Sequence, residues 1–163
     1  RDLTSPSDRR VRPPSEGVRD AWLRTVQESL DGARVLDLFA GSGALGLEAL
    51  SRGAASVDFV ETRPASLHSL KANVAALHVR NRCRIFKRDA LQYARSLQEG
   101  SYDLAFADPP YGSRMLDRLI EIWQQTAFSR VLTVEHASGH ELPVGGRRYL
   151  FHTTAVTTYE LER

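Results

Sequence analysis

Beyond Gly32 the chain alternates short apolar runs with longer amphipathic runs, and this alternation constrains the fold more than any other feature. Short apolar runs are typical of buried strands, whereas apolar residues that recur every three or four positions are typical of helices. Strands that alternate with helices need crossover connections, which are right-handed and place helices on both faces of a mainly parallel sheet. We therefore predict an α/β protein with a three-layer α/β/α, Rossmann-like fold.

The predicted strands are Arg34–Leu38, Ser56–Val60, Arg82–Lys87, Tyr102–Ala107 and Arg130–Glu135. The helices between and after them are Gly43–Arg52, Pro64–Leu77, Ala90–Gln98 and Met115–Gln125. Two further β-rich runs, Arg147–His152 and Ala155–Leu161, are separated by almost nothing and predict a terminal hairpin. The sheet is therefore expected to end in an antiparallel hairpin.

A single domain is expected over residues 1–163, with 33–163 as its core. Residues 1–14 are rich in Pro, Ser, Asp and Arg, which predicts an extended arm. Ser15 is expected to cap a leading helix, 15–31. No apolar run approaches the roughly 18 to 20 residues of a membrane span, so we expect a cytoplasmic protein. Cys83 is the one cysteine, which excludes an internal disulfide and a cysteine-based metal cluster.

A glycine-rich segment lies between the first predicted strand and its helix. In an open α/β sheet this turn is beyond the carboxyl ends of the strands, where nucleotide-like cofactors bind. Gly41, Gly43 and Gly46 fit the pattern G-x-G-x-x-G, although glycines can also serve a tight turn alone. The segment predicts a cofactor loop that contains Phe39, Ala40, Gly41, Ser42 and Gly43.

Acidic residues at the ends of three successive strands favour S-adenosylmethionine as the cofactor. Asp37 would repel a pyrophosphate but attract the ammonium group of a methionine moiety. Glu61 is placed to accept hydrogen bonds from the ribose hydroxyls. Asp89 is placed to accept from the adenine amino group, with the Ala90 N–H donating to the ring. A role as a helix cap is the alternative for Asp89.

The segment Asp108-Pro109-Pro110-Tyr111 is the most specific one in the chain. It follows the fourth predicted strand, at the same sheet edge as the glycine loop. Consecutive prolines fix the backbone and remove N–H donors, so the turn presents its carbonyl oxygens rigidly. The Asp108 carboxylate and the Pro109 carbonyl could accept both hydrogens of an exocyclic amine, and Tyr111 could stack on the base. This arrangement predicts methyl transfer to a base amine without a metal.

At these residues the sequence resembles the bacterial 16S rRNA guanine-N2 methyltransferases of the RsmD type. The similar segments are Arg12-Pro13 with Val18-Arg19, Leu36–Leu50 with residues 51–54, Phe59–Glu61, and Asp108–Tyr111. The resemblance implies a seven-stranded class I methyltransferase fold, S-adenosylmethionine as donor, and a guanine of 16S rRNA in an assembling small ribosomal subunit as acceptor. It also implies that Asp37, Gly41, Gly43, Glu61 and Asp89 hold the cofactor while Asp108 to Tyr111 receive the base.

The sequence departs from that family near its start. Pro14 stands where members usually have Thr, so a hydroxyl is missing on the cofactor side. Gly17 stands where an Arg is common, which removes one phosphate contact. A pair of strands that the family places ahead of the position of Arg1 is expected to be absent or shortened.

The formal charge of +2 is too small to indicate a polyanionic partner, but the basic residues are nearly all Arg, which grips phosphate with two N–H groups. We expect Arg10, Arg12 and Arg19 to contact RNA. A second basic group around the third strand is expected to be a solvated surface: Arg80, Arg82, Arg84, Lys87 and Arg88. The expected partner is 16S rRNA or the assembling small subunit, with no membrane and no metal, and the protein is expected to be a monomer.

Three alternatives to this function stay open at the level of the sequence. The Asp108 turn could equally seat the N6 amine of adenine in DNA or RNA. The glycine loop with Glu61 could belong to a dinucleotide-dependent oxidoreductase. The chain could also be a non-catalytic RNA-binding or assembly factor that keeps the fold.

Overall fold

The computed structural model describes residues 16–110, 113–152 and 154–162. The strands are Arg34–Leu38 (β1), Ser56–Val60 (β2), Cys83–Phe86 (β3), Tyr102–Ala107 (β4), Ser129–Ala137 (β5), Arg147–Phe151 (β6) and Thr154–Glu160 (β7). The α-helices are Glu16–Thr25 (α1), Ala44–Ser51 (α2), Pro64–Ala76 (α3), Ala90–Arg95 (α4) and Met115–Gln125 (α5). Two 3-10 turns, Gln27–Ser29 (η1) and Arg80–Arg82 (η2), complete the described elements.

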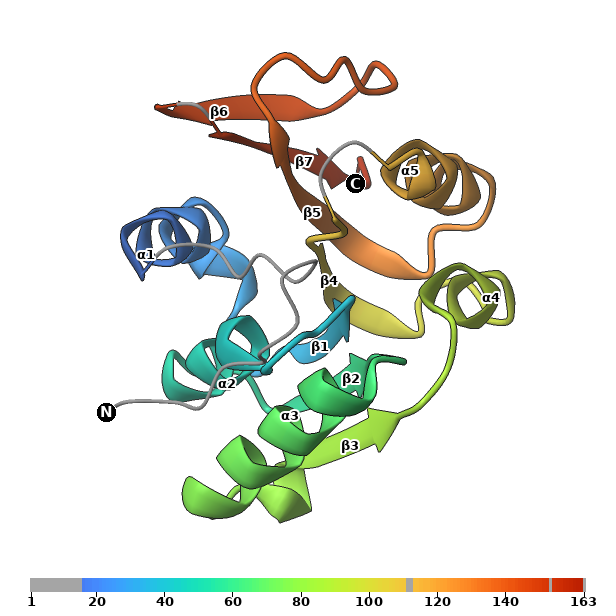
Figure 1. Ribbon diagram of the computed structural model, residues 1–163. Helices are drawn as coiled ribbons and strands as arrows, with labels where there is room; N and C mark the ends of the chain where they lie inside the picture. The colour runs from blue at the N-terminus through green and yellow to red at the C-terminus, as the bar shows by residue number, and fades with distance from the viewer. Residues whose placement is uncertain (1–15, 111–112, 153, 163) are drawn as a thin grey trace.

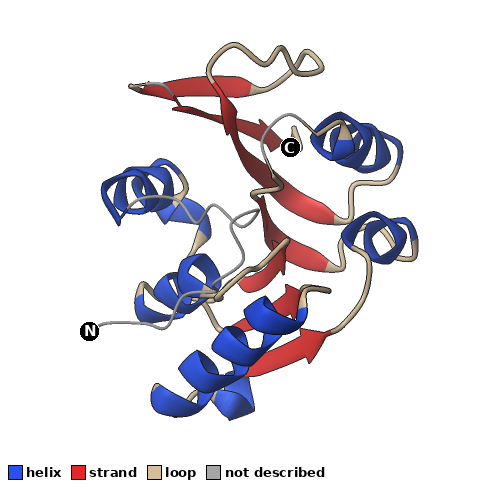
Figure 2. Ribbon diagram, viewed as in Figure 1, coloured by secondary structure: helices blue, strands red, loops and turns tan. Residues whose placement is uncertain are grey.

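The seven strands form one sheet in the order β3-β2-β1-β4-β5-β7-β6. Strands β1 to β5 are parallel to one another. The β6–β7 hairpin is antiparallel and pairs with β5 through β7. Helices α1, α2 and α3 lie on one face of the sheet, and α4 and α5 on the other (Figures 1 and 2). This confirms the predicted three-layer α/β/α, Rossmann-like fold with its terminal antiparallel hairpin.

Each face of the sheet has its own hydrophobic core, because side chains alternate along a strand. Trp22, Phe59 and Phe106 belong to the core under α1 to α3. Leu36 and Leu38 belong to the core under α4 and α5. Asp37, between these two leucines, therefore faces the α1–α3 side, which is where the glycine loop continues into α2.

The leading helix ends earlier than the predicted range of 15–31. It stops at Thr25, and η1 follows after Val26. Two adjacent β-branched residues disfavour helix continuation, and the Thr25 hydroxyl donates to the Trp22 carbonyl at 2.6 Å, a local alternative to regular helix bonding. Leu30 is still fully buried, so the apolar periodicity that suggested a longer helix reflects packing rather than helical backbone.

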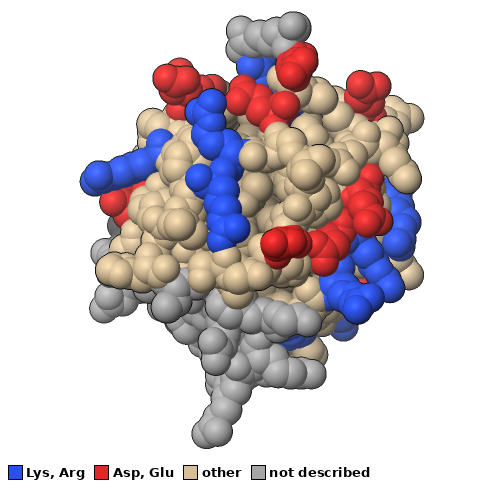
Figure 3. Space-filling view, turned by 90° about the horizontal axis from the view of Figure 1, so that it is seen from above, with Lys and Arg blue, Asp and Glu red and all other residues tan. Residues whose placement is uncertain are grey.

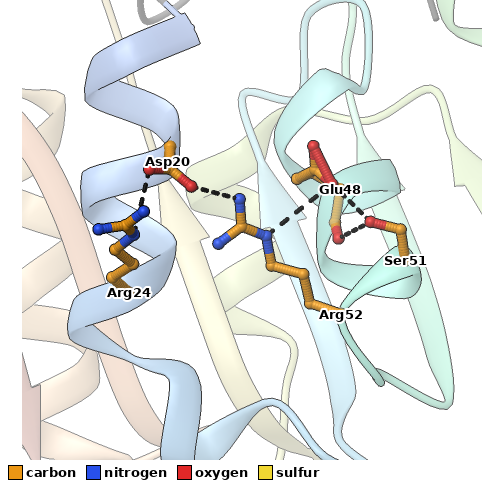
Figure 4. Close-up of polar contacts among 5 residues, drawn as sticks. All are labelled: Asp20, Arg24, Glu48, Ser51 and Arg52. Atoms are coloured by element: carbon orange, nitrogen blue, oxygen red, sulfur yellow. Dashed lines mark hydrogen bonds and ion pairs between the residues drawn. The ribbon is translucent and has the colours of Figure 1, made fainter.

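An ion-pair network links helix α1 to the C-terminal end of α2 (Figure 4). The Asp20 carboxylate accepts from Arg52 Nη2 at 2.7 Å and pairs with Arg24 Nε at 3.1 Å. Arg52 also lies 3.8 Å from Glu48 Oε2 on its own helix. A buried hydrogen bond from Trp22 Nε1 to Thr133 Oγ1, 2.8 Å long, ties the same helix to β5.

Replacing Arg52 with Ala should loosen this attachment. The Arg52 side chain is 22% exposed, whereas the competing Arg24 side chain is 76% exposed. We therefore expect R52A to lower the free energy of unfolding by about 1 kcal/mol and R24A by less than about 0.5 kcal/mol. Urea denaturation measures both. Equal losses in the two variants would contradict the proposed anchoring role of Arg52.

Candidate functional site

The glycine loop and the Asp108 turn begin side by side at the carboxyl edge of the sheet. They follow β1 and β4, which are hydrogen-bonded neighbours, and the last residues of the two strands, Leu38 and Ala107, are paired. The structure therefore brings together the two sequence segments that were predicted to carry the chemistry. Asp108, Pro109 and Pro110 are described, whereas Tyr111 lies outside the described residues.

The glycine loop turns sharply out of β1 through left-handed backbone conformations. Phe39 has φ 57°, Gly41 has φ 59° and Gly43 has φ 82°. For a residue with a side chain such as Phe39, this conformation costs about 1–2 kcal/mol. Strain of this kind persists where the surrounding structure enforces it, and it is concentrated at functional edges.

The loop is held in place by bonds from β2 and α3. The Ala40 N–H donates to the Val60 carbonyl at 3.1 Å, and the Gly41 N–H donates to Glu61 Oε1 at 2.9 Å. From α3, the buried Asn73 amide donates to the Ser42 carbonyl at 2.9 Å. A loop fixed in this way needs little further ordering when a ligand binds.

Glu61 is buried under the loop and bonded to the backbone. Its Oε1 accepts from Gly41, and its Oε2 accepts from the N–H groups of Thr62 and Arg63 at 2.7 and 2.8 Å. A carboxylate offers about four acceptor positions, and three are used by these backbone N–H groups, which leaves room for a ribose hydroxyl. Glu61 therefore connects the loop to the start of α3, and its contact with the ribose hydroxyls of a cofactor stays a prediction.

Asp37 lies beneath the start of α2. It is 3% exposed, and its Oδ2 accepts from the Gly46 N–H at 3.1 Å. Burial raises the pKa of this carboxyl well above its usual range, the Gly46 hydrogen bond opposes that shift, and the negative charge of Glu61 adds to it. A buried carboxyl with a raised pKa would be stabilised in its ionised form by a nearby cation.

Asp89 occupies the N-cap position of α4. Its Oδ2 accepts from the Gln92 N–H at 2.9 Å, and the residue is exposed. Ala90, the first residue of the helix, is buried. The helix-cap interpretation of Asp89 is thus realised by one oxygen, and the proposed contact of Asp89 and Ala90 with an adenine ring remains a prediction.

Asp108 lies among other carboxyl groups at the end of β4. Burial raises the pKa of its carboxyl well above the usual range, and the negative charges of Glu135 and Asp37 raise it further. Pro109 behind it is buried. Perturbed carboxyl groups of this kind are characteristic of binding and catalytic sites.

Two buried polar residues near this edge, Asn73 and Glu135, were not predicted from the sequence. Asn73 is 2% exposed on α3, among apolar neighbours of the core-facing side. Glu135 is 4% exposed near the end of β5. Both carried a signal that could have been used, because a polar residue at a position that the periodicity assigns to the core has to find a polar partner.

Replacing Asn73 with Ala should loosen the glycine loop from α3. The Ser42 carbonyl would lose its donor inside the protein, which costs about 1–3 kcal/mol of stability. We also expect weaker binding of a nucleoside cofactor, measured by calorimetry with S-adenosylhomocysteine. The control is Lys71→Ala, an exposed position on the same helix. The prediction fails if N73A and K71A bind the ligand equally well.

The basic residues around β3 are exposed, as predicted, and two of them are also hydrogen-bonded within the protein. Arg82 donates to the carbonyls of Ala54 and Ala55, and Arg84 forms a two-pronged pair with the buried Asp58. These two therefore serve the fold. Arg19 is partly buried on α1 and lines a small surface cavity with Asp20 and Arg52. The other residues expected to contact RNA, Arg10 and Arg12, lie outside the described residues.

Other surfaces of the described residues show weaker features. The face at the β6 end carries a short row of basic side chains bordered by acidic ones, rather than charge of one sign (Figure 3). A groove of about 520 Å³ between the end of α1 and the β6–β7 hairpin is lined by Arg24, Glu28, Arg147 and Glu160 among others. Within the described part of the chain, no helix has the length and apolar character of a membrane span, and no group of three or more metal-ligating side chains is assembled.

Comparison with known proteins gives a consistent set of relatives. Residues 1–154 match the family described as "Conserved hypothetical protein 95". Ribosomal RNA small subunit methyltransferase D of Escherichia coli K12 is 31% identical over 160 residues, which are 96% of this chain and 79% of that protein.

Solved structures share the fold of this chain. A hypothetical protein of Thermus thermophilus superimposes with a TM-score of 0.82 at 28% identity, covering 98% of this chain and 93% of the other. An RNA methyltransferase of Salinibacter ruber, solved with S-adenosylhomocysteine, has a TM-score of 0.72 at 15% identity over 91% and 93% of the two chains. At that identity the likeness concerns the fold alone.

Proposed function

Because the chain belongs to the family described as "Conserved hypothetical protein 95", whose relatives include ribosomal RNA small subunit methyltransferase D, we propose that it is an S-adenosylmethionine-dependent rRNA methyltransferase. The finer proposal is that it methylates the exocyclic N2 amine of a guanine in 16S rRNA, in an assembling small ribosomal subunit. The proposed acceptor, a guanine N2 amine, rests on the chemistry of the Asp108 turn as well as on the family.

One observation carries the proposal: the pairing of Leu38 with Ala107 sets the glycine loop next to the Asp108 turn. Methyl transfer needs donor and acceptor atoms held in line and nearly in contact, and two segments that begin on adjacent strands would favour that alignment. Close packing of Gly43 against α3 also keeps the loop in this position. An added Cβ at Gly43 would come within 2.3 Å of Leu70 Cδ1, so the backbone of the loop lies too close to α3 for a side chain.

The cofactor, when bound, supplies a methyl group on a positively charged sulfur. Glu61 and the loop backbone would hold its nucleoside portion, while Asp37 would face its cationic amino-acid portion. Asp108 and the Pro109 carbonyl would accept the two amine hydrogens and direct the nitrogen lone pair at the methyl carbon. After methyl transfer, the Asp108 carboxylate or water would accept the surplus proton from the nitrogen.

Labelled methyl transfer to isolated ribosomal particles tests this function. The protein is incubated with methyl-labelled S-adenosylmethionine and small subunits from cells that lack it, and the rRNA is digested to nucleosides for mass spectrometry. We expect label in N2-methylguanosine. Label in N6-methyladenosine would favour the adenine alternative, and no label in the rRNA of these small subunits would overturn the proposed substrate.

A further inference from the structure

Glu135 lies next to Asp108 at the same edge of the sheet. In the parallel pairing of β4 with β5, Ala107 is opposite Val134, so the next residues after these, Asp108 and Glu135, lie close together, and Glu135 acts electrostatically on Asp108. Ala107 and Val134 both pack into the core under α4 and α5. Side chains alternate along strands, so Asp108 and Glu135 both face the opposite side, which Asp37 also faces.

The Glu135 side chain is buried and held from β7. It is 4% exposed, and its Oε1 accepts from Thr154 Oγ1 at 3.2 Å. The same hydroxyl contacts the His136 carbonyl at 3.1 Å, which ties the carboxylate to the strand backbone. The negative charge of the buried Glu135 opposes ionisation of the partly buried Asp108, a cost that proteins accept mainly at sites of function.

Guanine and adenine differ at the atom beside the reactive amine. In guanine two ring nitrogens flank the carbon that carries the N2 amine, and one of them, N1, carries a hydrogen and donates. In adenine the ring nitrogen next to the N6 amine carries a lone pair and accepts. A carboxylate at that point would accept from guanine and repel adenine. Because Glu135 is shielded from water, the attraction and the repulsion would both be strong.

We propose that Glu135 selects guanine, by accepting the N1–H of the base while Asp108 and the Pro109 carbonyl hold its N2 amine. This inference rests on the proposed guanine-N2 activity and assigns its base preference to one residue. A site that pairs with an N–H of its substrate rejects analogues that lack it by several orders of magnitude. Glu135 would therefore exclude adenine without contacting the reacting nitrogen.

The test uses small subunits reconstituted with one of two nucleotides at the methylated position, guanosine or 2-aminopurine riboside. 2-Aminopurine keeps the amine and lacks the N1–H. We expect the natural protein to methylate the guanosine particle at least about 100-fold more efficiently, measured as kcat/KM. In Glu135→Gln the preference should fall below about fivefold, because the amide can donate to the bare ring nitrogen.

Two controls separate selection from folding. Glu135→Gln should bind S-adenosylhomocysteine within about twofold of the natural protein, since Glu135 is assigned to the base rather than the cofactor. Glu160→Gln, at the exposed end of β7, should keep the full preference for guanosine. Equal use of both particles by the natural protein, or an unchanged preference in Glu135→Gln, would overturn the inference. Formation of no N2-methylguanosine by the natural protein would overturn the proposed function itself.

Discussion

Asp108→Asn is expected to lower kcat for methyl transfer by roughly 10²–10³-fold while leaving the affinity for S-adenosylhomocysteine nearly unchanged. The amide presents N–H donors where the amine needs an acceptor, and it lacks the negative charge that stabilises positive charge developing on the nitrogen. Asp103→Asn is the matched control, because Asp103 lies at the other end of β4 and bonds to the Arg34 N–H. An activity loss of the same size in both variants would contradict the assigned role of Asp108.

The same substitution should stabilise the ligand-free protein. Burial raises the folded-state pKa of Asp108, so its contribution to stability is fully present below the unfolded value of 3.8 and is lost as the pH rises through the folded pKa. Asparagine does not ionise, so the variant does not lose stability as the pH rises. At neutral pH we expect D108N to gain about 1 kcal/mol, and the gain should vanish below pH 3.8, where the natural carboxyl is protonated in both states. Denaturation at several pH values measures this difference.

Gly46→Ala should destabilise the protein, although alanine favours helices. An added Cβ at Gly46 would come within 2.6 Å of Phe59 Cε1, 2.9 Å of Asp37 Oδ2 and 2.9 Å of Val57 Cγ1. Overpacking of this kind costs about 1–3 kcal/mol, which exceeds the gain of up to about 1 kcal/mol in helix propensity. Moving α2 away would also lengthen the hydrogen bond from Gly46 to Asp37 and displace the loop, so ligand affinity should fall roughly tenfold.

Gly17→Ala is the control for that experiment. Gly17 lies near the start of α1, and an added Cβ there meets nothing within 4 Å. With open space around it, only helix propensity acts, and stability should stay equal or rise by less than about 1 kcal/mol. If G46A were as stable as G17A and bound S-adenosylhomocysteine normally, the close packing of the loop would not be what positions the cofactor.

The order of elements was predictable because it depends on local periodicity. Runs such as Tyr102–Ala107 are apolar at nearly every position, as a strand covered on both faces must be, and the structure has a strand there. The positions at which helices end were harder to predict. Helix α1 stops at Thr25 because the Thr25 hydroxyl and the β-branched Val26 compete with the helix, a balance that the apolar pattern does not report.

The site was predictable where its chemistry lies in consecutive residues. The glycine loop and the Asp108 turn are local segments, and the strand pairing that joins them follows from the fold class. Asn73 and Glu135 come from elements far along the chain, and only the tertiary structure shows that they reach this edge. The relatives favour methyl transfer over the dinucleotide alternative, which the glycine pattern alone left open.

A crystal structure with S-adenosylhomocysteine tests the central claim most directly, because the claim concerns where the donor lies relative to Asp108. We predict the nucleoside against Glu61 and the glycine loop, with the sulfur directed toward the Asp108 carboxylate. A ligand bound elsewhere, for example in the groove between α1 and the β6–β7 hairpin, or with its sulfur turned away from Asp108, would contradict the account.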